Sequence, residues 1–183
     1  MASTAARSRD GIRSAVDQYQ GRLIRFAARI TGDVESARDV VQDTFLRLCR
    51  EDLDDVWDHL PAWLFRVCRN RALDVRKKEG PVQRLDAVAS AATSGPAADP
   101  HDVLERGEDA RRVLAALEEL PPAQQEVLRL RFQEDLSYKE ISAITGHSVG
   151  NVGFRIHTGI KQVRQRLRAA EGARRIEGGR TDA

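Results

Sequence analysis

The stretch LSYKEISAITGHSVGNVGFRIHTG, residues 136–159, predicts two helices joined by a tight turn. Ser137 followed by Glu140 is a capping box, so a helix should begin at Ser137. Gly146 stands where that helix must end in a left-handed backbone conformation, which glycine adopts at the least cost. Ser148 can then cap a second, longer helix. The stretch is therefore typical of a helix-turn-helix.

An apolar edge runs along the second helix in steps of three and four residues. Its members are Val149, Val152, Ile156, Ile160, Val163 and Leu167. No acidic residue occurs between Ile141 and Ala170, although acids are common elsewhere in the chain. A helix in the major groove of DNA lies among phosphates, which would repel carboxylates, so the pattern favours DNA binding. A helical hairpin packed against a protein is the alternative explanation.

The solvent side of the second helix carries side chains suited to reading DNA. Arg155 and Asn151 are the types that read guanine and adenine edges. Gly153 lies inside this helix, where glycine costs about 0.5–1 kcal/mol relative to alanine. We expect that Gly153 lets the backbone approach the groove closely while Phe154 makes an apolar contact. The alternative is that Gly153 is merely tolerated.

The composition of the 183 residues favours helices with small aliphatic cores. Hydrophobic residues make up 41%, aromatic residues only 5%, and charged residues 32%. The formal net charge is only +2, but the charges segregate locally. Residues 51–58 hold five acids, and residues 66–78 hold six bases against one acid. The basic strips at 66–78 and 141–170 are either two nucleic-acid contacts or two solvated helix faces.

The pattern predicts an all-α chain of two small helical domains joined by a flexible linker. Apolar residues at helical spacing run from Ile12 to Ile30 and again from Val34 to Leu48, with a break at Thr31-Gly32-Asp33. An acidic loop follows, and Pro61 suits the first turn of a third helix that ends at Gly80-Pro81. The first domain should therefore span residues 12–80.

The second domain should span residues 102–170 and contain the helix-turn-helix. Between the two domains, residues 81–101 are rich in Ala, Pro, Ser, Thr and Gly, which is typical of a flexible linker. Residues 1–11 and 171–183 are polar and are predicted to be a disordered N-terminus and a disordered tail.

Several kinds of protein are disfavoured by what the sequence lacks. The two cysteines, Cys49 and Cys68, have no partner motif and should be buried as small hydrophobic residues in a reducing cytosol. We find no signal-peptide pattern and no apolar run long enough to span a membrane. No phosphate-binding loop, metal-ligand cluster or activated nucleophile appears, so we expect a cytoplasmic non-enzyme with no catalytic residues, metal or cofactor.

Four motifs in order resemble the extracytoplasmic-function (ECF) subfamily of sigma-70 RNA polymerase sigma factors. LSYKEISAITGHSVGNVGFRIHTGIKQVRQRL looks like their −35-reading helix-turn-helix, and LEELPPAQQEVLRLRFQEDLSYKEIS like the helices before it. ESARDVVQDTFLRLCR resembles the helix that docks on RNA polymerase, and PAWLFRVCRNRALDVRKKE the helix that opens and reads the −10 element. The resemblance implies region 2 at 12–80, region 4 at 102–170, and core polymerase, promoter DNA and an anti-sigma factor as partners.

The resemblance also implies three groups of site residues. Residues for core polymerase binding are Asp39, Gln42, Asp43 and Leu46, whose spacing puts them on one helix face. Residues for the −10 element are Trp57, Phe65, Arg66, Arg69, Asn70 and Arg71, because single-strand capture needs basic groups beside aromatic faces. Residues for the −35 element are Ser148, Asn151, Gly153, Phe154, Arg155, His157, Thr158 and Lys161.

The sequence departs from the family pattern on the reading helix. Gly153 and Thr158 stand where the family usually has basic residues, and Phe154 replaces a small polar residue. The departures put the usual −35 sequence in doubt but not the docking mode. The main competing hypothesis is a helix-turn-helix regulator that is not a sigma subunit, which accounts only for residues 122–170.

Overall fold

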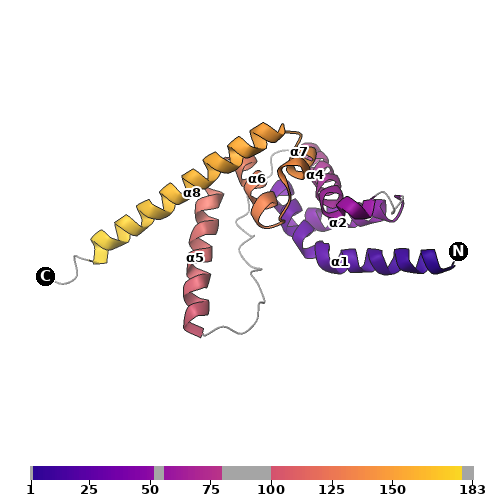
Figure 1. The fold of residues 1–183 in the computed structure, drawn as a ribbon, viewed down its shortest axis with the longest axis horizontal. Helices are drawn as coiled ribbons and strands as arrows, with labels where there is room; N and C mark the ends of the chain where they lie inside the picture. The colour runs from indigo at the N-terminus through magenta and orange to yellow at the C-terminus, as the bar shows by residue number, and fades with distance from the viewer. Residues whose placement is uncertain (1, 52–55, 80–99, 179–183) are drawn as a thin grey trace. The chain divides into compact units, whose positions relative to one another are not determined.

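The computed structural model describes residues 2–51, 56–79 and 100–178, and every element in these ranges is a helix (Figure 1). The chain divides into two compact units, Met1–Thr93 and Ser94–Ala183. The prediction of an all-α protein with two small helical domains is therefore confirmed. Residues 81–99 of the predicted linker lie outside the described residues.

The first unit is built from α1 (Ala2–Thr31), α2 (Val34–Leu48), the short 3-10 helix η1 (Trp57–His59) and α4 (Leu60–Glu79). Gly32 adopts a positive φ of 83° and ends α1. Asp33 then caps α2 by accepting a 2.7 Å hydrogen bond from the Ser36 N–H, and this bond lowers the pKa of the Asp33 carboxyl. The predicted break at residues 31–33 is confirmed.

The core of the first unit combines aliphatic side chains with a few aromatic ones. Its fully buried members include Leu23, Val40, Leu48, Leu64, Phe65 and Cys68. The rings of Phe26 on α1 and Phe65 on α4 meet edge to face, with centroids 5.2 Å apart. Burial raises the pKa of the Cys68 thiol to about 12, so this thiol stays protonated at neutral pH. The prediction for Cys49 was wrong, because its side chain is exposed where α2 ends.

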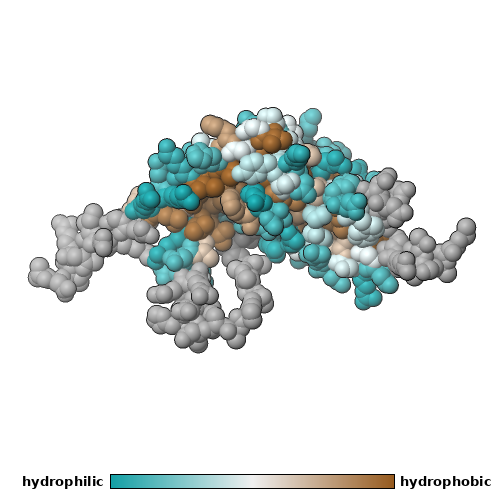
Figure 2. Space-filling model, in the orientation of Figure 1, coloured by the Kyte–Doolittle hydropathy of each residue, from teal (hydrophilic) through white to brown (hydrophobic). Residues whose placement is uncertain are grey.

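The second unit contains α5 (Pro100–Glu118), α6 (Pro122–Phe132), α7 (Tyr138–Thr145) and α8 (Val149–Gly178). Its buried residues include Leu120, Val127, Leu130, Leu136, Ile141, Ile144, Val152 and Ile156. Gly159 lets α8 pack closely, because a Cβ at this position would lie 2.8 Å from Cδ1 of Leu128. Figure 2 shows apolar side chains gathered where α5, α6 and α8 meet.

The helices extend further than the sequence pattern predicted at both ends of the chain. Helix α1 begins at Ala2 and α8 continues to Gly178, so the segments predicted to be disordered are largely helical. Alanine and arginine, both strong helix formers, are frequent in these segments, and no proline interrupts them. Apolar periodicity marks only the part of a helix that has an apolar face, so it gives no signal for helical turns beyond that part.

Candidate functional site

The helix-turn-helix in the second unit has the predicted caps. The Ser137 hydroxyl accepts a 3.3 Å hydrogen bond from the Glu140 N–H, and the Glu140 carboxylate accepts a 2.7 Å bond from the Ser137 N–H. Gly146 has φ 75° in the left-handed region. The Ser148 hydroxyl accepts from the Asn151 N–H at 3.2 Å and caps α8. The bonds of Ser137 and Ser148 thus fix where α7 and α8 begin, and Gly146 ends α7.

The predicted −35 residues lie at the start of α8 and along its outer face. Ser148, Asn151, Phe154, His157 and Lys161 are exposed, and Gly153, Arg155 and Thr158 are half-buried. Phe154 is 66% exposed, which is unusual for a large apolar side chain. The structure therefore brings all eight residues together on or beside one surface.

Hydrogen bonds organise this surface before any ligand arrives. The Arg155 Nε–H donates to Oδ1 of Asn151 with an N···O distance of 2.6 Å. The Thr158 hydroxyl donates to the backbone carbonyl of Phe154, one turn earlier in the helix. The sequence pattern placed these residues on one face but did not reveal that two of them are paired.

Gly153 has a neighbour that the sequence did not predict. A Cβ at this position would lie 3.5 Å from Cε2 of Tyr138, which is an ordinary contact distance. Gly153 is therefore half-buried, with the Tyr138 ring on one side and solvent on the other. An alanine would fit there without displacing the ring.

Basic side chains continue along the outer face of α8 past the predicted residues. A shallow groove is lined by His157, Ile160, Lys161, Arg164, Gln165 and Arg168. Lys161, Arg164 and Arg168 are exposed, and their spacing puts them on the face that carries Phe154. Arg166 points elsewhere, because its Nε–H donates to the Glu119 carboxylate at 2.7 Å. Helical spacing alone could have extended the predicted surface to Arg168.

The predicted −10 residues of the first unit lie partly on the outer face of α4. Arg66 and Asn70 are exposed, and Arg69 and Arg71 are half-buried. Trp57, in η1, is also half-buried, and its indole ring packs so closely on Gly11 that a Cβ there would lie 2.8 Å from Cζ2. Part of the Trp57 ring is thus used for packing against α1.

The prediction that Phe65 faces promoter bases is wrong for this structure. Its side chain has no exposed surface. The ring packs edge to face on Phe26, so Phe65 belongs to the inner face of α4. A basic-aromatic sequence pattern does not distinguish an aromatic residue on the surface from one in the core beneath it.

The predicted polymerase-docking residues lie on α2. Asp39, Gln42 and Leu46 are exposed, and Leu46 is 47% exposed. Asp43 is half-buried, and its carboxylate accepts a 2.8 Å hydrogen bond from Nε of Arg71 on α4. One residue of the predicted docking set is thus paired with one residue of the predicted −10 set.

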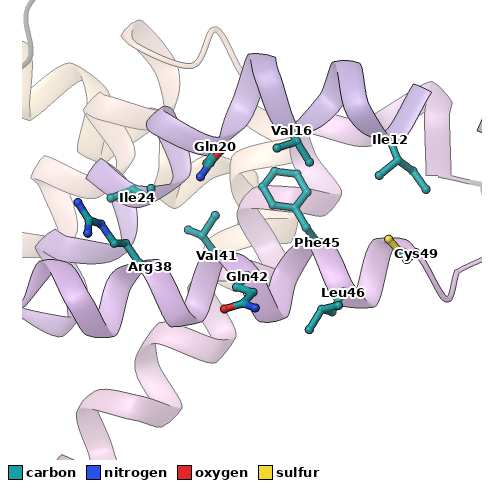
Figure 3. A pocket seen from close by; sticks show the side chains of 10 residues that line it. All are labelled: Ile12, Val16, Gln20, Ile24, Arg38, Val41, Gln42, Phe45, Leu46 and Cys49. Carbon is teal, nitrogen blue, oxygen red and sulfur yellow. The ribbon is translucent and has the colours of Figure 1, made fainter. Parts of the chain in front are cut away.

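An apolar groove lies beside this face, between α1 and α2 (Figure 3). It has a volume of about 420 Å³ and is lined by Ile12, Val16, Gln20, Ile24, Arg38, Val41, Gln42, Phe45, Leu46 and Cys49. Gln42 and Leu46 belong both to the groove and to the predicted docking set. Sequence reasoning did not predict the groove, because it depends on how α1 packs on α2.

Comparison with known proteins identifies the two units. The family model Sigma-70 region 2 matches residues 15–81, and the family model Sigma-70, region 4 matches residues 110–163. The ECF RNA polymerase sigma factor SigW of Bacillus subtilis is 30% identical over 169 residues, which cover 87% of this chain and 90% of SigW. The chain belongs to the ECF subfamily of RNA polymerase sigma factors.

Two further proteins resemble this sigma factor. The ECF RNA polymerase sigma factor SigE of Mycolicibacterium smegmatis is 33% identical over 154 residues, which cover 83% of this chain but only 60% of SigE. The chain thus spans less than two thirds of that relative. The solved structure of CnrH in complex with the cytosolic domain of CnrY matches with a TM-score of 0.56 and 27% identity. That match covers 90% of this chain and 95% of CnrH.

The region boundaries place the candidate surfaces within this sigma factor. Region 2 contains α2 and α4, which carry the predicted docking and −10 residues. Region 4 begins within α5 and ends within α8, so its matched part includes the helix-turn-helix. The basic side chains at 164 and 168 lie just past the matched residues. None of the described helices is both long and apolar enough to span a membrane.

Proposed function

We propose that this chain binds core RNA polymerase as its promoter-specificity subunit, recognises −35 and −10 elements, and assists DNA opening. The observation that carries the proposal is an outer face of α8 that has no carboxylate between positions 149 and 170, in the same chain as a region 2 fold. A sigma subunit needs both a DNA reader and a polymerase-docking domain, whereas a simple repressor needs only the first. Membership of the chain in the ECF subfamily supports a sigma subunit over a simple repressor.

The second unit would read the −35 element through α8. An α-helix fits the major groove of B-DNA, and the first two turns of α8 offer polar, basic and apolar side chains to base edges. Ser148, Asn151, Gly153, Phe154, Arg155, His157, Thr158 and Lys161 remain the proposed contact residues. Phe154 suits a thymine methyl, because it is apolar and largely exposed.

The first unit would hold the displaced strand of the −10 element. Exposed Arg66 and Asn70 and half-buried Arg69, Arg71 and Trp57 can contact phosphates and unstacked bases. Phe65 is omitted from this set, because it is buried beneath the surface. We assign it the role of supporting α4 from the core.

The exposed face of α2 would dock on the polymerase. Asp39 and Gln42 offer acidic and polar groups, and Leu46 offers an apolar anchor at the rim of the α1–α2 groove. This combination fits a basic helical partner, which the family implies is the clamp of the largest polymerase subunit. Asp43 would join this face only in part, because Arg71 already occupies its carboxylate.

Regulation and location belong to the same proposal. We propose a separate anti-sigma factor as regulator, and the match to CnrH, solved with the cytosolic domain of CnrY, supports a protein partner. We also propose that the chain acts in the cytoplasm, where RNA polymerase is found. It would work by binding alone, without catalysis, metal or cofactor.

Transcription with purified core RNA polymerase tests the proposed function. Adding this chain should produce run-off transcripts from its own promoter and none from a template whose −35 element is scrambled. A helix-turn-helix regulator that is not a sigma subunit would still shift the promoter duplex but would start no transcript. That second result would reject the sigma reading in favour of the alternative.

A further inference from the structure

Asn151 and Arg155 form one hydrogen-bonded unit on the outer face of α8. The Arg155 Nε–H donates to Oδ1 of Asn151 at 2.6 Å, and residues four apart lie on neighbouring turns of a helix. Asn151 is exposed and Arg155 is half-buried, so the unit is accessible. We infer that this unit reads a guanine in the −35 element, with Arg155 contacting the base and Asn151 positioning it. The inference rests on the proposed role of α8 in DNA recognition.

The atoms left over after pairing decide which base fits. With Nε–H used, the Arg155 guanidinium still has its two terminal amino groups, which are donors only. The Asn151 carboxamide keeps its NH₂ donor, while its oxygen faces the guanidinium. Guanine shows two acceptors in the major groove, O6 and N7, and a bidentate arginine matches both.

Adenine fits this unit less well. An asparagine that reads adenine must accept from N6 through its oxygen and donate to N7 through its nitrogen, both in the plane of the base. The Asn151 oxygen already accepts a short bond from Arg155, which uses one of its two lone pairs and holds the carboxamide against the guanidinium. A contact in the plane of an adenine would have to be made without disturbing that geometry, so it fits less well than a guanine contact by Arg155. The structure thus replaces the sequence-based expectation of two readers, one for each purine, with a single guanine reader.

The pairing also prepares Arg155 for binding. A free arginine side chain samples many rotamers, and binding must immobilise it at a cost in entropy. The bond to Asn151 restricts those rotamers before DNA arrives. Asn151 is therefore a positioning residue, and its removal should weaken guanine preference without creating preference for another base.

Base preference of the holoenzyme tests the inference. Full-length chain would be bound to core RNA polymerase and offered promoter duplexes randomised across the −35 element, and bound duplexes would be sequenced. The parent should enrich guanine at one position. Arg155→Ala should lose that preference by roughly tenfold or more, and Asn151→Ala by several-fold. Gln165→Ala, an exposed change on the same helix, is the matched control and should leave the preference unchanged.

A single-atom change in the DNA gives an independent readout. Replacing the selected guanine by 7-deazaguanine removes the N7 acceptor and keeps Watson–Crick pairing. The parent should lose roughly tenfold in affinity, and Arg155→Ala should lose nothing further. Circular dichroism of each variant confirms that loss of preference is not loss of folding.

Distinct outcomes separate this inference from the proposed function. Adenine enriched at the position that Asn151→Ala alters would overturn the guanine reader and leave the sigma function intact. Guanine enrichment that neither Arg155→Ala nor 7-deazaguanine reduces would also overturn the guanine reader and leave the sigma function intact. A chain that gives the holoenzyme neither sequence selection nor transcription would overturn both.

Discussion

At the scale of single residues, two glycines of α8 offer opposite tests of the same substitution. Gly153→Ala should raise the free energy of unfolding by about 0.5–1 kcal/mol, because alanine is the better helix former and its Cβ would meet Tyr138 at 3.5 Å. We also expect weaker −35 binding, because Gly153 is only half-buried and a methyl group beside the Tyr138 ring would hold this part of the backbone further from the groove. Melting temperature and duplex affinity of the same variant check both effects.

Gly159→Ala is the matched control on the same helix. Its Cβ would lie 2.8 Å from Cδ1 of the buried Leu128, so overpacking of about 1–3 kcal/mol should exceed the gain in helix propensity. This variant should melt at a lower temperature than the parent. Close approach would be rejected as the reason for Gly153 if Gly153→Ala were more stable and bound the −35 duplex undiminished.

The Asp43–Arg71 ion pair allows docking to be separated from internal support. The pair is partly exposed, so it should contribute only about 0–1 kcal/mol to stability. Asp43→Arg should weaken association with core polymerase by roughly tenfold, because it puts a positive charge on a face proposed to meet a basic partner. Co-purification at two salt concentrations measures the loss.

The charge-swapped double variant Asp43→Arg/Arg71→Asp tests whether Asp43 contacts the polymerase or only pairs with Arg71. It restores an ion pair between α2 and α4 but leaves a positive charge at position 43. If Asp43 docks on the polymerase, the double variant should bind core as weakly as Asp43→Arg. Recovery of binding in the double variant would instead mean that Asp43 acts only by holding Arg71.

At the scale of elements, α8 is longer than the groove that it is proposed to enter. Arg168 lies about 21 Å along the helix axis from Phe154, at about 1.5 Å per residue, whereas the major groove is about 12 Å wide. Arg164 and Arg168 therefore suit the phosphate backbone at the edge of the groove. Arg164→Gln/Arg168→Gln should lower affinity similarly for matched and mismatched duplexes.

The salt dependence of binding shows how many phosphate contacts the double variant loses. Each lost phosphate contact should reduce the slope of log affinity against log salt concentration by about 0.9, so the double variant should lose roughly two such steps. Arg166→Gln is the control. Because Arg166 is paired with the Glu119 carboxylate, this substitution should leave the slope unchanged. An unchanged slope in the double variant would remove these two arginines from the DNA surface.

The features that could be predicted from the sequence are those whose residues lie close together in the chain. The capping box at Ser137, the exit at Gly146 and the break at Thr31-Gly32-Asp33 involve residues within a few positions of each other, and all are found in the structure. Burial of Phe65 and pairing of Asp43 with Arg71 depend on how α4 packs against α1 and α2. Such contacts join residues far apart in the sequence, so composition and spacing did not reveal them.

At the scale of the whole molecule, each unit has a hydrophobic core of its own. Leu23, Leu64 and Phe65 are fully buried in the first unit, as are Val127, Leu130 and Ile141 in the second. Units with separate cores are expected to fold independently. The fragments 1–93 and 94–183 should therefore give circular dichroism spectra that sum to the spectrum of the intact chain, and the second fragment alone should bind a −35 duplex.

Function, in contrast, should require the covalent connection. When one unit of the intact chain is bound, the covalent connection holds the other at an effective concentration that can reach the millimolar range, far above that of a free fragment. An equimolar mixture of the two fragments with core polymerase should thus produce much less promoter-dependent transcript than the intact chain. Raising the fragment concentration should recover part of the transcript, because each unit keeps its own contacts. Full activity of the mixture at low concentration would contradict this view, since it would mean that the units hold each other without the connection.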